Sequence, residues 1–312
     1  MHKSVLLGET IQFLDLKDGD VVVDATVGSG GHTKELARKV GDSGKVISID
    51  VDQSAIDFAK KRLTEQDKDL LNRVVFVHDN FCNLEKIVQQ EGLSGVNAIL
   101  ADLGWRIEQI EDPKRGMSFL REAKLDMRLD QERNSLTAHE IVNEWSEKKL
   151  RDIFWGFGEE KNAKTIVAEI VRKRKEKQIE TTTQLAEIVE SKCVARKKGR
   201  LHCATKVFQA LRIAVNDELG NLEKFLTQSV SVLEKKGRIA VISFHSLEDR
   251  IVKKFFQTNA RGCVCPKEFP VCICKGKSKL KILMRKPIVA GEDELKQNKR
   301  SRSAKLRVAQ KI

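Results

Sequence analysis

The sequence predicts an α/β protein whose core is a Rossmann-like, doubly wound parallel sheet with an inserted helical domain. Three observations lead to this fold. Strand and helix patterns alternate from the start of the chain to residue 104, only helical patterns follow to about residue 205, and the α/β pattern then returns. We therefore expect one domain at residues 1–104 and 206–312 and a second at residues 105–205. The 312 residues suffice for both.

A glycine-rich loop organises the first part of the chain. It lies between an apolar strand at residues 21–23 and a helix at residues 34–40, and it reads Asp24-Ala25-Thr26-Val27-Gly28-Ser29-Gly30-Gly31-His32. Glycine tolerates positive φ and lets the backbone approach a ligand without a Cβ in the way. A strand, a glycine loop and a helix in this order are typical of nucleotide-binding α/β folds, although an ordinary strand-to-helix turn has the same pattern.

Two acidic residues narrow the choice of ligand. A second strand at residues 46–49 ends at Asp50, about 20 residues after the loop, where a carboxylate suits the hydroxyls of a bound ribose. The loop lacks the Lys-Ser or Lys-Thr ending of a P-loop. Asp24 would repel a pyrophosphate, but it could hold an ammonium group or a water near a sulfonium. The pattern favours S-adenosylmethionine over a dinucleotide.

The following strands place further polar residues at the same edge of the sheet. The predicted elements after Asp50 are a helix at 54–63, a strand at 74–77, a helix at 84–90 and a strand at 98–101. Asp102 follows the last of these strands, and residues 78–81 follow the strand before it. Ligands of open parallel sheets bind at the carboxyl ends of the strands, so we expect these residues to share one site.

The predicted insertion is helical and basic. Its helices are expected at residues 138–145, 148–155, 162–174 and 182–193. Two basic runs, at residues 172–175 and 196–200, contain Lys173 and Lys197. Such runs are usually solvated faces, but two of them beside a ligand site, in a chain of net charge +13, favour a surface that binds the phosphates of a nucleic acid.

The α/β pattern returns in the last third of the chain. Helices are expected at 208–219 and 222–233, a strand at 238–246, and a closing pair of strands at 281–285 and 304–309. Residues 292–302 between that pair are highly charged and are expected to be exposed. No apolar run is long enough for a membrane span, and the first residues do not read as a signal peptide, so we expect a cytoplasmic protein.

The seven cysteines are expected to be reduced thiols in a chain of this kind, with one exception. Two Cys-x-Cys pairs lie close together, and four thiolates can hold zinc tetrahedrally. The usual structural pair is Cys-x-x-Cys, and free thiols or a redox pair remain the alternative. The candidate zinc ligands are Cys263, Cys265, Cys272 and Cys274.

Several segments together resemble the MraW family of ribosomal RNA small subunit methyltransferases, and the likeness runs over nearly the whole chain. They are the glycine loop, Asp102-Leu103-Gly104, Arg115-Gly116-Met117-Ser118-Phe119, Leu125-Asp126-Met127-Arg128-Leu129-Asp130, Gly158-Glu159-Glu160, Ala204-Thr205-Lys206-Val207-Phe208-Gln209-Ala210-Leu211-Arg212-Ile213 and Ile242-Ser243-Phe244-His245-Ser246-Leu247-Glu248-Asp249-Arg250. The resemblance implies a class I methyltransferase fold, S-adenosylmethionine as donor, and N4 of a cytidine in the decoding region of 16S rRNA as acceptor.

The resemblance also implies which residues contact the donor: Gly30, Gly31, His32, Asp50, Phe81, Asp102 and Gln109. The sequence departs from the family pattern just after Asp102. Arg106 and Ile107 stand where the family has two small hydroxyl residues, and bulky side chains there could narrow the pocket or change its acceptor. Cys203 likewise replaces a proline of the family, which is a milder change.

The chemistry suggests roles on the acceptor side. Asp102 could accept a hydrogen bond from the acceptor amine and take its proton, or it could serve only to bind the donor. Asp126 and Arg128 could line the acceptor side or form a local salt bridge. His245 could contact the flipped base or its phosphate, or satisfy loop backbone.

Two other functions stay open at this point. The departure at Arg106 and Ile107 permits a non-catalytic, RNA-binding ribosome-assembly factor that keeps the methyltransferase fold. A methyltransferase with a different acceptor is the other alternative.

Overall fold

The computed structural model describes residues 4–193, 202–262, 265 and 276–312. It divides into two compact units, Met1–Gly104 with Leu219–Ile312, and Trp105–Glu218. The first boundary falls where the sequence places it, after Gly104. The second falls after Glu218 and not after residue 205, because helix α10 (Ala204–Asn216) packs against the helices of the second unit.

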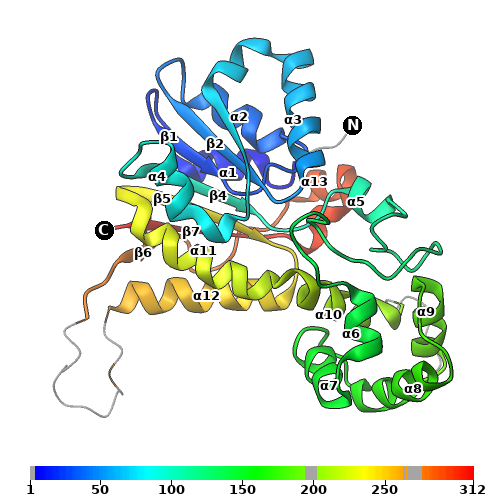
Figure 1. Ribbon diagram of the computed structural model, residues 1–312. Coiled ribbons are helices and arrows are strands. Elements are labelled where there is room, and N and C mark those ends of the chain that lie inside the picture. The colour runs from blue at the N-terminus through cyan, green and yellow to red at the C-terminus, as the bar shows by residue number, and fades with distance from the viewer. Residues whose placement is uncertain (1–3, 194–201, 263–264, 266–275) are drawn as a thin grey trace. The chain divides into compact units, whose positions relative to one another are not determined.

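The first unit contains a seven-stranded sheet in the order β3-β2-β1-β4-β5-β7-β6 (Figure 1). Strands β1 to β5 are parallel, and β7 runs antiparallel between β5 and β6, so the expected final pair does close the sheet. The strands are β1 (Val21–Asp24), β2 (Lys45–Asp50), β3 (Val74–His78), β4 (Val96–Asp102), β5 (Leu233–Ser243), β6 (Leu280–Ile282) and β7 (Lys305–Lys311).

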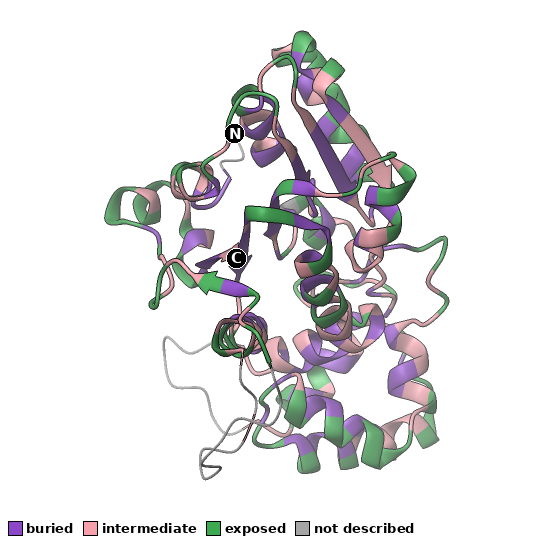
Figure 2. Ribbon diagram, turned by 90° about the vertical axis from the view of Figure 1, so that its left-hand side faces the viewer, coloured by how far each residue is buried: buried purple, intermediate pink, exposed green. Residues whose placement is uncertain are grey.

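Alternate residues of the strands are buried on opposite faces of this sheet, as the pleat requires. Val23 and Ile47 belong to a core with helices α4 (Leu84–Gln90), α11 (Glu218–Val232) and α12 (Ser246–Arg261). Their neighbours Val22 and Val46 belong to a separate core with α1 (Leu7–Leu14), α2 (Gly31–Lys39) and α3 (Gln53–Gln66). Both faces are therefore covered, and the strands are largely buried (Figure 2). The predicted doubly wound α/β fold is confirmed.

Sequence patterns missed three α-helices of this unit, α1, α12 and the short α13 (Glu292–Gln297). Helix α1 was not predicted, and α12 begins where the sequence suggested only a polar end to the fifth strand. In α12, Val252 and Phe256 are buried one turn apart and face the sheet. The charged stretch before β7 forms a short helix and a 3₁₀ turn, and Ser301 is buried within it. The shorter elements are η1 (Lys68–Arg73), η2 (Phe81–Asn83), α13 (Glu292–Gln297) and η3 (Lys299–Ser303).

The second unit is helical, as predicted, and has its own apolar core. Its elements are α5 (Ile107–Glu111), α6 (Ala138–Glu144), α7 (Glu147–Gly156), α8 (Ala163–Glu176), α9 (Thr182–Glu190) and α10. Phe154, Ile166 and Leu211 come from three different helices and are fully buried there. No helix in the described part of the chain is both long and apolar enough to cross a membrane.

One pair of cysteines contradicts the expectation of reduced thiols. Cys193, just after α9, and Cys203, just before α10, form a disulfide, with Cα atoms 6.5 Å apart. The pairing could not be read from the sequence, because it depends on how the ends of two helices meet in space.

We expect Cys203→Ser to lower the free energy of unfolding of the oxidised protein by about 2 kcal/mol, because the disulfide restricts a short loop of the unfolded chain. Chemical denaturation with and without a thiol reductant measures this. A Cys82→Ser variant is the control, since Cys82 is not part of a disulfide. Equal reductant sensitivity of Cys203→Ser and the unsubstituted protein would contradict the expectation.

Candidate functional site

The acidic residues singled out in the sequence lie at one edge of the sheet. Asp24, Asp50 and Asp102 are the last residues of β1, β2 and β4, and His78 is the last residue of β3. These four strands are parallel neighbours, so their carboxyl ends form a continuous rim. Open parallel sheets bind their ligands at such a rim.

The glycine loop is fixed above this rim by its backbone. The Val27 amide donates to the Ile49 carbonyl at 2.9 Å, and the Gly30 amide donates to the Val27 carbonyl at 2.8 Å. Gly30 has φ 74°, and a Cβ on it would lie 2.9 Å from the Cβ of Ala59 in α3. The loop thus requires glycine both for its conformation and for its packing on α3.

We expect Gly30→Ala to destabilise the first unit by roughly 1–2 kcal/mol, because the left-handed conformation is strained for alanine and α3 would have to shift. Thermal unfolding measures the loss. Gly8→Ala is the matched control, because Gly8 lies in α1 with open space around it. A Gly30→Ala protein as stable as the Gly8→Ala control would show that the loop tolerates a side chain.

Asp50 is held by the backbone on both of its oxygens. Its Oδ2 accepts a hydrogen bond from the Gly28 amide, and its Oδ1 accepts one from the Asp52 amide, each at 2.9 Å. The first bond ties the glycine loop to the end of β2. A carboxylate fixed in this way is already oriented for polar groups of a ligand at the rim.

Asp24 does not face a ligand as the sequence suggested. Its side chain is fully buried, where its Oδ2 accepts a hydrogen bond from Thr33 Oγ1 at 2.7 Å and its Oδ1 accepts a longer one from the Thr26 amide. Burial raises the pKa of Asp24 to about 6, although His32 and these hydrogen bonds act in the opposite direction. Asp24 therefore stabilises the glycine loop through these hydrogen bonds, and its buried carboxylate cannot hold an ammonium group of a ligand.

His32 and Asp102 form a pair at the rim. His32 lies in the first turn of α2, and its Nε2 is 3.5 Å from Asp102 Oδ2. Burial lowers the pKa of His32, but the hydrogen bond and charge of Asp102, with the charge of Asp24, outweigh it and raise that pKa above its ordinary value.

The backbone holds Asp102 in place and leaves one oxygen unsatisfied. The Asp102 amide donates to Thr26 Oγ1 at 2.7 Å. Its Oδ1 is buried and has no hydrogen-bond partner among the described residues. Buried polar atoms without a partner are rare, and each calls for an explanation such as a ligand. Asp102 is therefore the residue of the rim with the clearest capacity to accept a hydrogen bond from a bound molecule.

Six of the seven residues predicted to contact the methyl donor lie in the first unit. Phe81 is in η2, just after β3, and its ring meets that of Phe225 edge to face at 5.1 Å. Gln109 belongs to the second unit, where its Oε1 accepts a hydrogen bond from the Arg106 amide at 3.0 Å. The side chain of Arg106 is only 7% exposed. The role of Gln109 toward the donor stays a prediction.

The predicted acceptor-side residues Asp126 and Arg128 form a local ion pair in the second unit. Arg128 Nε and Nη2 reach the two Asp126 oxygens at 2.9 and 2.7 Å, and Nη1 donates to the Asn134 carbonyl at 2.8 Å. Burial raises the pKa of Asp126, but the hydrogen bonds from Arg128 outweigh it, so the pKa falls below its ordinary value. This geometry fits a structural clamp, and substrate contact by either residue stays a prediction.

His245 and Lys173 also have acidic neighbours on their own helices. His245 precedes α12, and its Nε2 lies 3.0 Å from Glu248 Oε1. Lys173 Nζ lies 3.3 Å from Glu176 in α8, and Arg172 pairs with the same glutamate. Acidic residues of the same helix thus offset part of the positive charge of residues 172–175, and this weakens the attraction of the basic run for a polyanion.

Other predicted residues lie outside the described part of the chain. These are Lys197 and three of the candidate zinc ligands, Cys263, Cys272 and Cys274. Cys265 is described and has a free thiol. The zinc site and the second basic run therefore stay predictions.

Sequence reasoning missed three features of the site. It did not predict that His32 pairs with Asp102. It also did not predict that Thr26 Oγ1 accepts a hydrogen bond from the Asp102 amide, or that Thr33 Oγ1 donates one to Asp24. The two threonines carried a weak signal, since small hydroxyl residues beside a glycine loop are available to bond nearby carboxylates and amides.

Comparison with known families and proteins gives a consistent result. The sequence model of the MraW methylase family matches residues 1–312. The protein named ribosomal RNA small subunit methyltransferase H in Brevibacillus brevis is 44% identical, over 100% of this chain and 98% of its own. The protein of the same name in Halothermothrix orenii is 46% identical with the same coverage.

Among solved structures, an rRNA methylase from Streptococcus thermophilus aligns with 100% of this chain and 99% of its own. Its sequence identity is 13% and its TM-score 0.44, and we draw nothing from a likeness at that level.

Proposed function

Because the chain belongs to the MraW methylase family, we propose that it transfers a methyl group from S-adenosylmethionine to N4 of a cytidine in the decoding region of 16S rRNA. Family membership itself indicates an S-adenosylmethionine-dependent methyltransferase of small-subunit ribosomal RNA. The observation that carries the finer proposal is Asp102, whose buried Oδ1 lacks a partner within the described residues at the rim where the donor would bind.

The residues of the rim fit the donor. Asp50 would accept hydrogen bonds from the ribose hydroxyls, and the donor would lie against the backbone of the glycine loop at Gly30 and Gly31. Phe81 offers an aromatic surface beside the rim. S-adenosylmethionine supplies an electrophilic methyl group on a sulfonium, and the protein needs mainly to align the acceptor with it.

Asp102 would activate the acceptor. The lone pair on cytidine N4 is delocalised into the ring, and a hydrogen-bond acceptor on the amine favours the pyramidal, nucleophilic form. Asp102 Oδ1 can accept an N4–H hydrogen bond, and the carboxylate can take the proton as the methyl group is transferred. His32 would hold the other oxygen in position. A cytidine in folded RNA must first leave its stack.

The substrate proposal rests on charge and on the second unit. The net charge of +13 suits a polyanionic partner, and the helical unit at Trp105–Glu218 would recognise the RNA, with Lys173 and Lys197 as phosphate contacts. We place this reaction in the cytoplasm, on 16S rRNA in the small ribosomal subunit.

We expect Asp50→Ala to weaken binding of S-adenosylmethionine by roughly 1–3 kcal/mol, the cost of losing buried hydrogen bonds to the ribose. Isothermal titration calorimetry measures the change. Asp57→Asn is the control, because Asp57 is exposed on α3. An unaltered donor affinity in Asp50→Ala would mean that the ribose binds elsewhere.

Nucleoside mass spectrometry of 16S rRNA tests the acceptor directly. Cells that lack the protein should lose N4-methylation of one cytidine, and the unsubstituted gene should restore it. The burial of Arg106, which replaces a small residue of the family, is the one observation that favours a non-catalytic assembly factor. That alternative predicts unchanged cytidine methylation in the deleted strain, together with a defect in small-subunit assembly.

A further inference from the structure

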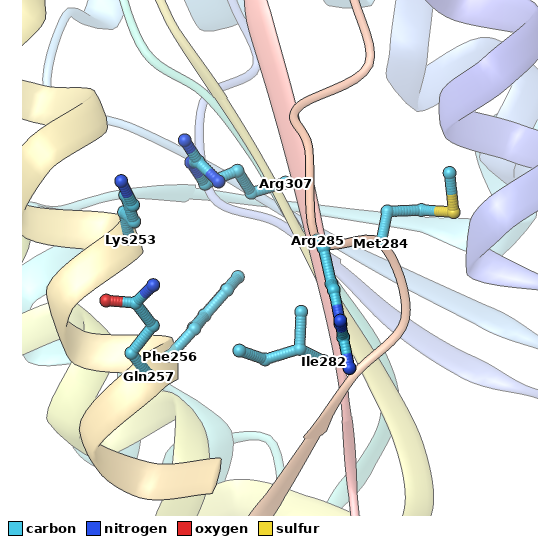
Figure 3. A pocket seen from close by; sticks show the side chains of 7 residues that line it. All are labelled: Lys253, Phe256, Gln257, Ile282, Met284, Arg285 and Arg307. Atoms are coloured by element: carbon cyan, nitrogen blue, oxygen red, sulfur yellow. The ribbon is translucent and has the colours of Figure 1, made fainter.

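A pocket in the first unit lies away from the residues assigned to the donor. It opens between α12 and the edge formed by β6 and β7 (Figure 3). Its lining residues are Lys253, Phe256, Gln257, Ile282, Met284, Arg285 and Arg307. Three of these carry a positive charge and none carries a negative one, so the pocket is suited to an anion. We call it the cationic pocket.

Strand register places this pocket near the rim of the sheet. Asp102 of β4 pairs with Ile242 of β5, and Ile242 pairs in turn with Leu306 of β7. Arg307 is the next residue of β7, opposite Val241. Arg307 is therefore two strands from β4 and level with Ala101, one residue before Asp102. Because side chains alternate along a strand, Arg307 lies on the face covered by α12, whereas Asp102 lies on the face of α2. Both residues lie near the end of the sheet where β5 ends and β7 begins, so an RNA strand with a base at Asp102 would have to cross the rim to place a neighbouring phosphate at the pocket.

The charge of the pocket is only partly neutralised. Arg307 Nε lies 2.6 Å from Asp249 Oδ1, and Lys305 Nζ lies 3.2 Å from Asp249 Oδ2, so two cations share one carboxylate. The ion pair also fixes the buried Arg307 side chain. Within the described residues, neither Lys253 nor Arg285 has a hydrogen bond or ion pair. These two side chains stand on opposite sides of the pocket (Figure 3).

The lining indicates what kind of anion fits. The three cations and the Gln257 amide are donors for phosphate oxygens. Phe256, Ile282 and Met284 give the pocket an apolar part, and Met284 is 39% exposed. Phe256 is almost fully buried beneath the pocket, so the exposed donors suit a phosphate group and not a whole nucleotide.

We propose that the cationic pocket binds a backbone phosphate of the RNA strand that carries the target nucleotide. The proposal rests on the proposed function, because it takes RNA as the substrate. It adds an RNA contact in the sheet unit to those expected in the helical unit.

Two matched pairs of variants test this. Lys253→Ala is compared with Lys254→Ala, and Arg285→Ala with Lys286→Ala; all four residues are exposed, but only the first of each pair lines the pocket. Affinity for small ribosomal subunits from a strain that lacks the protein is measured between 0.05 and about 0.3 M salt. Thermal unfolding checks that each variant is folded.

Each pocket variant should bind the subunit roughly four- to fivefold more weakly at about 0.15 M salt. The slope of log affinity against log salt should also become less steep by about 1, the value expected for one lost phosphate contact. The KM for the subunit should rise, while kcat and donor affinity should stay the same. The neighbouring Lys254→Ala and Lys286→Ala should change affinity by less than about twofold. Equal effects within both pairs would overturn the proposal, because they would reflect only general surface charge.

The test separates this proposal from the proposed function. If the unsubstituted protein binds subunits but leaves cytidine N4 unmethylated, the proposed function fails, and the difference within each pair still decides the phosphate site. If methylation occurs and the pairs do not differ, only the phosphate site fails.

Discussion

Asp102→Asn is expected to lower kcat for methylation of the small subunit by roughly 10²- to 10⁴-fold, the usual contribution of a positioned general base. Asparagine keeps the size of the side chain and can still accept a hydrogen bond. It cannot take a proton from N4, and its NH2 group can rotate to face the acceptor amine as a hydrogen-bond donor. The loss should therefore fall on the chemical step.

The same variant separates the two roles that Asp102 could have. If Asp102 serves as acceptor for the amine, Asp102→Asn keeps nearly normal affinity for S-adenosylmethionine while kcat falls. If Asp102 only binds the donor, the donor affinity falls and kcat at saturating donor is retained. Calorimetry and steady-state kinetics on one preparation distinguish these results. Full activity with full donor affinity would exclude both roles.

Asp24→Asn is expected to remove a pH dependence of stability that amounts to about 3 kcal/mol in total. The pKa of Asp24 is about 6 in the folded protein, against 3.8 for the ordinary carboxyl, because the side chain is fully buried. The folded state therefore holds a proton that the unfolded state releases between these values. Stability from this group is greatest below pH 4 and is lost as pH rises through about 6.

Chemical denaturation between pH 4 and 7 measures this effect. Over that range, the unfolding free energy of the unsubstituted protein should fall by about 2 kcal/mol relative to that of Asp24→Asn. The comparison cancels the other titrating groups, and the exposed Asp57→Asn should follow the unsubstituted protein. Parallel pH profiles for Asp24→Asn and the unsubstituted protein would show that Asp24 titrates normally.

The sheet was predictable because its signals are local. Val22 and Val23 belong to a short apolar run that favours a strand buried on both faces, and the runs that end at Asp50 and Asp102 repeat the pattern. The parallel order of these strands then fixes where their ends lie. For this reason the sequence alone predicts that the three aspartates lie along one edge of the sheet.

The remaining features depend on contacts between distant segments. Asp24 looks like Asp50 in sequence, but it is enclosed by Thr33 and the loop backbone, which no spacing rule reveals. The disulfide between Cys193 and Cys203 depends on where two helix ends meet. The cationic pocket collects residues from α12, from β6 and the segment that follows it, and from β7, which are separate along the chain.

The central claim is that the rim from β2 to β4 binds the methyl donor with Asp102 beside the transferred group. A crystal structure with S-adenosylhomocysteine tests it most directly. We predict that the ribose hydroxyls lie within hydrogen-bonding distance of Asp50, and that the sulfur lies over the glycine loop on the side of Asp102 and His32. A ligand bound elsewhere, or one that leaves both Asp50 and Asp102 without contact, would contradict the account.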